Sequence, residues 1–388
     1  MPHTLNRIGV QNDIGNPAWV PGTGWLASGA GQLGRVLVYV SGGSGTVLAT
    51  NTSIGAGCVA SYASVYENFA TAAGFDLSNT SWQFISTGGG YTIIPGGSFL
   101  PVGSVQATPT VLGLGDDTAV TQAFTTGSFP GSTALTVCSN GFVSTNTGNG
   151  TGYTPTVATF LSDPAASFRC WHDFNPTLVG SGTVKWEESA TVTSITWDGV
   201  WDYGGTGAGD ASTMQFQFYP NGDVVVAFGS VSLVGTSGTG FLVGYSPAGA
   251  SADPGNTDWS ATSATVLGAA DVLPLALSAS SRPIIGTSWG MTTSNIPAPT
   301  IVVEIIGLSD PGINDLFFIG APGCGLRANL DLLNAAVVAA PTHAWSFAIP
   351  NNIALLNLHL YASSAAFAPV NAFGAITSNG IDGLMGDF

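Results

Sequence analysis

The chain has 388 residues, only 7% of them charged, and its formal net charge is −16. An ordinary domain carries about 25% charged residues, so hydroxyl, amide and backbone groups must hydrate this surface. Six basic residues are too few for a nucleic-acid groove or an anionic lipid surface, and no apolar run reaches the roughly 18 residues of a membrane-spanning helix. We therefore predict no nucleic-acid partner and no membrane insertion.

Residues 1–48 are expected to form a glycine-rich N-terminal arm. Val36–Val40, the glycine-rich turn after it and Val47–Thr50 predict a hairpin. The apolar run could add a strand to a neighbouring chain, and its residues are Arg35, Val36, Leu37, Val38, Tyr39 and Val40. The opening residues lack the basic and apolar segments of a signal peptide, so either the chain is a mature form or its export uses another route.

The next expected unit is a small module, residues 49–100, packed on a central domain. Helical periodicity is nearly absent from the whole sequence. Two short segments are helix candidates, Tyr62–Ala73 and Leu330–Ala340, and the second is equally consistent with a strand.

The densest strand pattern lies in residues 101–270. In the segment from Met214 to Tyr219, glutamines alternate with apolar residues, which predicts a strand with two unlike faces. The Asn-Gly pair at Asn221 predicts a hairpin turn back into Val224–Phe228. A second strand-rich block covers residues 271–388. The predicted fold class is all-β, with two antiparallel β-sandwich domains after the arm and the small module.

Ordered motifs carry a resemblance to a known family. In the central region they are Gly113-Leu-Gly-Asp-Asp117, Val137-Cys-Ser-Asn-Gly-Phe142, Cys170-Trp-His-Asp-Phe-Asn-Pro176, Ile195-Thr-Trp-Asp-Gly-Val200, Phe216-Gln-Phe-Tyr-Pro-Asn-Gly222 and Val243-Gly-Tyr-Ser-Pro-Ala-Gly249. They resemble a nidogen-like β-sandwich of secreted proteins from planctomycete-type bacteria. The upstream motifs Gly55-Ala-Gly-Cys58, Tyr66-Glu-Asn-Phe69 and Phe75-Asp-Leu-Ser78 resemble the module that precedes it.

The last third of the chain extends this resemblance. Its motifs are Ser281-Arg-Pro-Ile-Ile-Gly286, Asn295-Ile-Pro297, Ile319-Gly-Ala-Pro-Gly-Cys324, Ala348-Ile-Pro350 and Ser378-Asn-Gly380. They resemble a C-terminal β-domain that is common on exported proteins of such bacteria. The resemblance covers residues 49–388 and implies an exported, multi-domain β-protein of uncharacterised activity. Residues 1–48 have no counterpart in it.

The four cysteines are spaced too widely for a zinc site. They allow two disulfides with three connectivities, and free buried thiols are the alternative. Cys138 and Cys170 are expected to pair because both lie on strands of one predicted sandwich, which leaves Cys58 and Cys324 as a second pair. Disulfides indicate an extracellular or cell-surface location.

Binding candidates are few. No cofactor is predicted, and calcium is the ligand best suited to the adjacent carboxylates of Asp116 and Asp117. Trp201, Tyr203 and Trp259 lie in glycine-rich segments, where exposed rings could stack on a polysaccharide.

The predicted function is that of a non-catalytic extracellular structural protein, which self-associates as a filament, sheath or matrix subunit or acts as an adhesin. The chain is not expected to be an enzyme, because side chains suited to catalysis are scarce. A carbohydrate-binding module or lectin is the alternative. A secreted hydrolase is the second alternative, and it requires His172, Asp198 or Asp202 to line a cleft.

Overall fold

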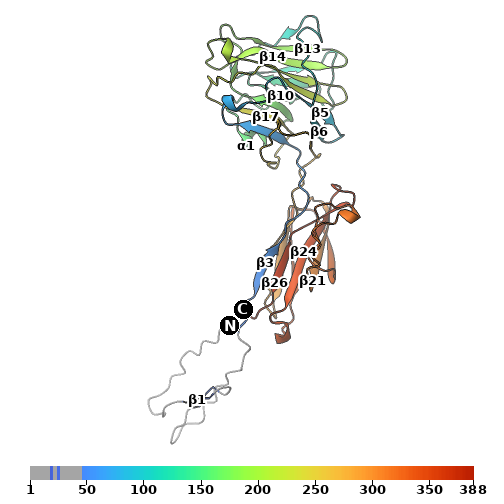
Figure 1. Cartoon of the computed structure of the whole chain (residues 1–388). Helices are drawn as coiled ribbons and strands as arrows, with labels where there is room; N and C mark the ends of the chain where they lie inside the picture. The colour runs from blue at the N-terminus through green and yellow to red at the C-terminus, as the bar shows by residue number, and fades with distance from the viewer. Residues whose placement is uncertain (1–17, 21–23, 27–45) are drawn as a thin grey trace. The chain divides into compact units, whose positions relative to one another are not determined.

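The computed structural model describes residues 18–20, 24–26 and 46–388, and the chain divides into two compact units. We call Met1–Val59 with Pro274–Phe388 the split unit, and Ala60–Leu273 the inserted unit. Strands dominate both units (Figure 1), and all paired strands are antiparallel. The predicted all-β fold is confirmed.

The inserted unit contains two sheets. The six-stranded sheet has the order β4 (Val65–Phe69), β17 (Phe241–Ser246), β11 (Ser167–Trp171), β10 (Phe142–Thr145), β9 (Ala134–Cys138) and β8 (Ala119–Ala123). The nine-stranded sheet has the order β18 (Thr265–Val266), β6 (Tyr91–Pro95), β5 (Ser81–Ser86), β16 (Val224–Phe228), β15 (Ala211–Phe218), β14 (Thr193–Asp202), β13 (Thr183–Glu188) and β7 (Thr110–Val111), and β12 (Phe174–Asn175) pairs with β14. The short helices are α1 (Val157–Phe160), η1 (Ala72–Gly74) and η2 (Ala208–Asp210).

One aromatic-rich core joins these two sheets. Phe168 of the six-stranded sheet packs edge to face on Phe84 and Phe218 of the nine-stranded sheet, with ring centroids 5.4 and 5.6 Å apart. The predicted alternation on β15 holds for its apolar residues, since Met214, Phe216 and Phe218 all enter this core. Aromatic pairs of this kind stabilise a core beyond the area that they bury.

The glutamines of β15 are also buried, because residues 98–100 cover their face of the sheet. The Gln215 amide donates to the Leu100 carbonyl at 2.9 Å, and the Gln217 amide donates to the Ser98 carbonyl at 2.6 Å. The predicted hairpin is confirmed: β15 pairs with β16, and Gly222 in the turn has a φ of 92°, where glycine avoids strain.

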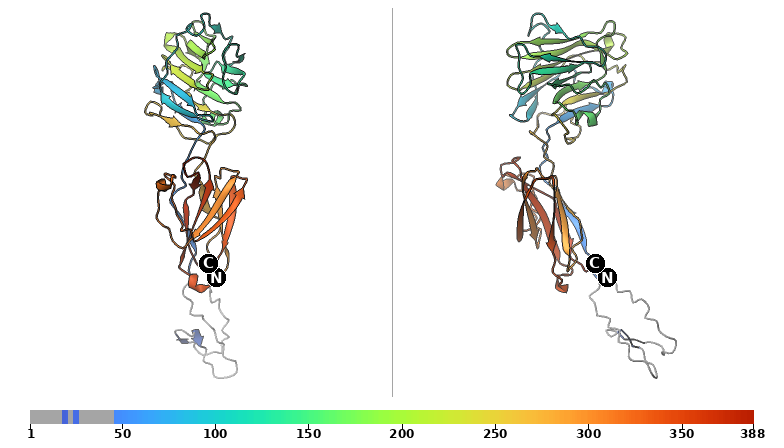
Figure 2. Two further views of the ribbon diagram at one scale, coloured as in Figure 1. Left: turned by 90° about the vertical axis from the view of Figure 1, so that its right-hand side faces the viewer. Right: turned by 180° about the vertical axis from the view of Figure 1, so that it is seen from behind.

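The split unit is a second sandwich (Figures 1 and 2). Its six-stranded sheet has the order β22 (Leu332–Val338), β21 (Thr300–Gly307), β24 (His359–Phe367), β26 (Gly380–Leu384) and β3 (Thr50–Ile54), and β25 (Ala375–Thr377) also pairs with β24. Its three-stranded sheet has the order β19 (Ala276–Ala279), β20 (Ser288–Ser294) and β23 (Thr342–Ala348). The remaining elements are the hairpin of β1 (Ala18–Val20) and β2 (Gly24–Leu26), with η3 (Phe317–Ile319) and η4 (Ile353–Leu355).

The expected small module at residues 49–100 is not a separate unit in this structure. Strand β3 pairs along its whole length with β26, next to the C-terminus of the chain (Figure 1). Strand β4 instead joins the six-stranded sheet of the inserted unit, and β5 and β6 join its nine-stranded sheet. Long-range pairing divides this segment between two cores, whereas the last expected boundary, at residue 271, lies close to Pro274.

Both helix candidates form strands. The first, Tyr62–Ala73, contains β4 and the start of η1, and the second contains β22. The apolar side chains of Val65 and Phe69 point into the main core while Tyr66 packs on the opposite face of the sheet. Two-sided burial therefore favours a strand over a helix at β4.

Candidate functional site

Strand β22 lies at the end of the six-stranded sheet of the split unit. All seven of its residues pair with β21 in one continuous register, without a bulge. Among residues 46–388, no strand pairs with its other side. Its outward backbone N–H and C=O groups are therefore available to another strand.

Both faces of β22 are accessible. Glu304 on β21 identifies the inner face, because its carboxylate accepts from Asn334 of β22 and contacts His343 of the opposite sheet, each at 2.7 Å. Leu332 shares this inner face but is about half exposed, and only Val338 of the strand is buried. The three-stranded sheet therefore leaves much of β22 uncovered.

The outer face continues as an apolar row across three strands. Val337 of β22 is 84% exposed and lies opposite Ile301 of β21, which is also exposed. Phe367 of β24 follows Ala366, the partner of Val302, and is 53% exposed. Exposed apolar side chains on adjacent strands are typical of an interaction surface.

The usual features that prevent edge-to-edge pairing are missing from β22. The strand contains no lysine or other charged residue, and no proline. Natural edge strands commonly use charged residues and proline to block association. Asp331 precedes it, but the Asp331 carboxylate accepts the Leu308 N–H at 2.8 Å. The sequence identified the apolar run without indicating that it forms an uncovered edge.

The predicted partner for such an edge lies in the arm. Arg35–Val40 falls outside the described residues, so the strand expected there, and its hairpin, remain predictions.

The two predicted calcium ligands lie beside a third carboxylate. Oxygen atoms of Asp116, Asp117 and Asp173 all lie within 4.8 Å of one another. Burial, followed by the nearby Asp117 carboxylate, raises the pKa of Asp173 to about 6. Asp173 was not predicted as a ligand, because it is more than 50 residues away in the sequence.

A second group of carboxylates consists of Glu67, Asp76 and Asp258. Glu67 on β4 is buried, and its carboxylate accepts the Trp259 N–H at 2.9 Å. Burial is the main cause that raises the pKa of Glu67 to about 7, and Asp76 and Asp258 add to the increase.

We expect this group to make the inserted unit less stable as the pH rises. The Glu67 pKa is about 4.3 in an unfolded chain and higher in the fold, so its favourable contribution is present below pH ~4 and is lost as the pH rises through about 7. Urea unfolding at pH 4 and pH 8 should show a loss of about 1–3 kcal/mol from this residue. Glu67→Gln should remove that loss, and Asp258→Asn should retain most of it, because burial and not Asp258 is the main cause of the raised Glu67 pKa. Equal pH dependence in Glu67→Gln and wild type would contradict the assignment.

The first of the two predicted disulfides, between Cys138 and Cys170, is not formed. Cys138 and Cys170 are free and buried. They lie on β9 and β11, which β10 separates, and their side chains pack in different clusters on opposite faces of the sheet. A disulfide between them would need both strands to move.

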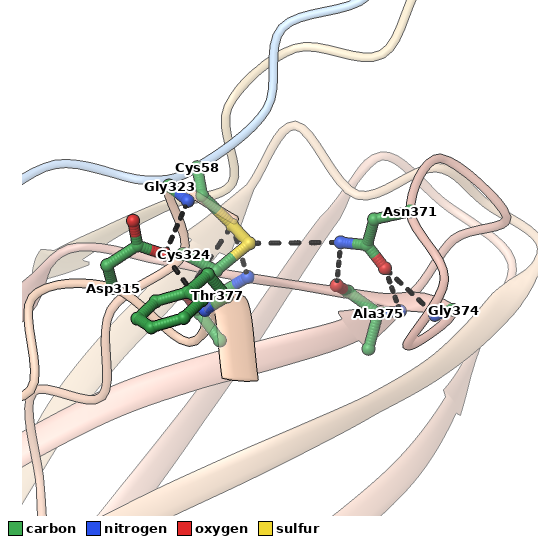
Figure 3. Close-up of a disulfide and its surroundings, with 9 residues drawn as sticks. Cys58, Asp315, Gly323, Cys324, Asn371, Gly374, Ala375 and Thr377 are labelled. Carbon is green, nitrogen blue, oxygen red and sulfur yellow. Dashed lines mark hydrogen bonds between the residues drawn. A yellow bond between two sulfur atoms is a disulfide. The ribbon is translucent and has the colours of Figure 1, made fainter. Parts of the chain in front are cut away.

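The second predicted pair is present. Cys58 and Cys324 form a disulfide within the split unit (Figure 3). The Thr377 N–H donates to the Cys58 sulfur at 3.1 Å, and the Cys58 N–H donates to the Thr377 carbonyl at 3.0 Å. Asp315 holds the loop around Cys324 by accepting the Gly323 N–H at 2.8 Å. The bridge therefore fixes the segment after β3 to the loop before β22.

The three predicted glycan-stacking residues do not form one surface. Trp259 is only 2% exposed and packs against Trp82 and Phe84, with ring centroids 5.4 and 5.8 Å apart. It is a core residue, so its assignment as a glycan contact is wrong. Tyr203 is half exposed and Trp201 is partly exposed, and both remain accessible.

Two of the three hydrolase candidates are buried inside the inserted unit and do not line a cleft. His172 and Asp202 are fully buried, and His172 stacks on Phe241. Asp202 and Ser237 approach the same His172 nitrogen, Nε2, at 3.2 and 3.3 Å, while Nδ1 lies 2.8 Å from the Gly240 carbonyl. A catalytic triad instead places its serine and acid on different ring nitrogens. Asp198 pairs with Lys185.

The comparisons with known proteins identify no relative. No family model, curated protein or solved structure matches the chain. Among the residues that the structure describes, no helix has the length and apolar character needed to cross a membrane.

Proposed function

We propose that this chain is a non-catalytic, extracellular structural or adhesive protein that self-associates by strand addition. In this proposal, residues 35–40 of one copy pair with the free edge of β22 in another copy. The observation that carries it is the uncovered, uncharged and unbulged edge of β22.

The donor segment matches this edge in length and character. Residues 36–40 are uninterrupted apolar residues, and β22 offers seven residues in regular register. Backbone hydrogen bonds would supply affinity, and alternate side chains would contact the apolar row of Val337, Ile301 and Phe367.

The positions of donor and acceptor favour a head-to-tail assembly. The donor precedes residue 46 and the acceptor lies in the C-terminal third, so each copy would use two different surfaces. Head-to-tail contacts of this type form rings or filaments. The Cys58–Cys324 disulfide fits the oxidising conditions outside the cell.

Two variants test the proposal: one lacks the donor segment, and the other has an altered acceptor edge. One variant lacks residues 1–45 but keeps Val47 and Ala49, whose N–H groups bond to Asp387 and Phe388. The other carries Leu333→Lys and Val337→Lys, which should weaken association by at least about tenfold. Each variant alone should be monomeric in analytical ultracentrifugation, and their mixture should form a 1:1 dimer while wild type forms larger species.

Val179→Lys with Val234→Lys is the matched control. Both residues are exposed and lie in loops of the inserted unit, so this variant should assemble like wild type. Monomeric wild type at high concentration, or unchanged assembly after loss of residues 1–45, would refute strand addition.

A further inference from the structure

Two connections of the inserted unit cross between its sheets and meet at one point. The first joins β7 of the nine-stranded sheet to β8 of the six-stranded sheet and carries Asp116 and Asp117. The second joins β11 of the six-stranded sheet to β12, which pairs with the nine-stranded sheet, and carries Asp173. Carboxylate oxygens of the three aspartates lie within 4.8 Å of one another, so the two connections lie side by side.

Asp173 is a buried residue whose carboxylate has no partner among the described residues. Asp173 is only 5% exposed, and no hydrogen bond or ion pair from the described residues reaches its side chain. Oδ1 of Asp116 is also buried and unpartnered. Buried carboxylates without partners are costly unless a cation compensates them.

A fully buried asparagine fixes the geometry around these acids. The Asn140 amide nitrogen donates to Oδ1 of Asp117 at 2.8 Å, while its amide oxygen accepts the N–H of Phe174, next to Asp173, at 3.1 Å. Asn140 thus holds both connections at once. Hydrogen bonds of this kind orient the ligands of metal sites.

We propose that Asp116, Asp117 and Asp173 bind one calcium ion, which links the two sheets of the inserted unit. The donors are all carboxylate oxygens on irregular loops, which suit the flexible coordination of Ca²⁺ better than the strict octahedron of Mg²⁺. Asp116 and Asp117 are only partly buried, so solvent has access and water can complete the coordination.

This site lies in the inserted unit, so it is independent of strand addition at β22. Bound calcium would offset the repulsion between the three carboxylates and hold both sheet crossings together. The ion should therefore stabilise the inserted unit specifically, whether or not the protein self-associates.

Calcium titration of the chelator-treated full chain tests the proposal. Isothermal titration calorimetry with CaCl₂ should show one ion per chain, with a Kd on the order of 10⁻⁵ to 10⁻³ M. Hydrogen exchange of β8 and β11 should slow with calcium, and MgCl₂ should bind at least about tenfold more weakly.

Asp173→Asn gives the sharpest variant. The amide keeps the shape but removes one of three like charges, so in EDTA it should be at least as stable as wild type while losing the calcium response. Asp116→Asn, at a partly exposed position, should weaken calcium binding by about 10-fold or more. It replaces Asp173→Asn in the test if that variant does not fold. Asp258→Asn, in the other acidic group, should bind calcium like wild type.

Two results would overturn the binding site itself. One is the absence of heat and of protection with millimolar CaCl₂. The other is an unchanged calcium response in Asp116→Asn and Asp173→Asn, which would locate binding elsewhere. Equal affinity for MgCl₂ would overturn the assignment to calcium.

Discussion

Asp163→Ala is expected to lower the free energy of unfolding of the inserted unit by about 3–5 kcal/mol. Asp163 pairs with Arg169 of β11, and both side chains are almost fully buried. The guanidinium lies over the rings of Phe142 and Trp171, 4.2 and 4.3 Å from their centroids. Removal of the carboxylate would leave an uncompensated charge in an apolar cluster. Hydrogen exchange of β10 and β11 against urea measures the effect in this unit alone.

The Lys185–Asp198 pair supplies the matched control. It lies in the same unit but is partly exposed, so Asp198→Ala should cost less than about 1 kcal/mol. Arg169→Met combined with Asp163→Ala should recover part of the lost stability, since a paired charge can be replaced by apolar groups. Similar losses in Asp163→Ala and Asp198→Ala would contradict the importance of the buried pair.

Cys58→Ser with Cys324→Ser is expected to destabilise the split unit by about 4 kcal/mol. The cysteines are 266 residues apart, but the effective loop is shorter while the inserted unit stays folded. Backbone hydrogen bonds of 2.9 and 2.7 Å join Ser61 and Val272 at the two ends of that unit. The disulfide then closes only residues 58–61 and 272–324. Chain entropy for a loop of that length gives the expected loss.

Hydrogen exchange separates the two units in this second test. Protection of β24 should fall in the serine variant, whereas protection of β14 in the inserted unit should not change. Reductant under partly denaturing conditions should destabilise wild type, which has the disulfide, but not the serine variant, which lacks it. Both proteins keep the free thiols of Cys138 and Cys170, so these cannot cause the difference. A stability loss in β14 alone would contradict the location of the bridge.

Local patterns determined much of the fold. The shortage of charge and the absence of helical periodicity predicted an all-β chain. Alternation from Met214 to Tyr219, followed by an Asn-Gly turn, predicted β15, β16 and the apolar face that enters the core. These features depend on neighbours in sequence, because strand periodicity and turn geometry are set within a few residues.

Local sequence patterns predicted side-chain burial wrongly where that burial depends on distant segments. Gln215 and Gln217 alternate like solvent-facing residues, but residues 98–100 cover them. Trp259 lies in a glycine-rich stretch typical of a surface loop, but its ring packs in the core against Trp82. The covering residues are at least 115 positions away in the sequence in each case, so no local signal reports them.

By itself, the sequence determined the strand-rich class, the hairpin of β15 and β16, and the scarcity of side chains suited to catalysis. Only the tertiary structure decided that β3 completes a sheet beside β26, that Cys138 and Cys170 remain free thiols, and that Asp173 meets Asp116 and Asp117. The physical reason is the nature of sheet pairing. A strand's backbone accepts any partner of compatible register, so long-range contacts follow from how all strands bury their apolar faces together.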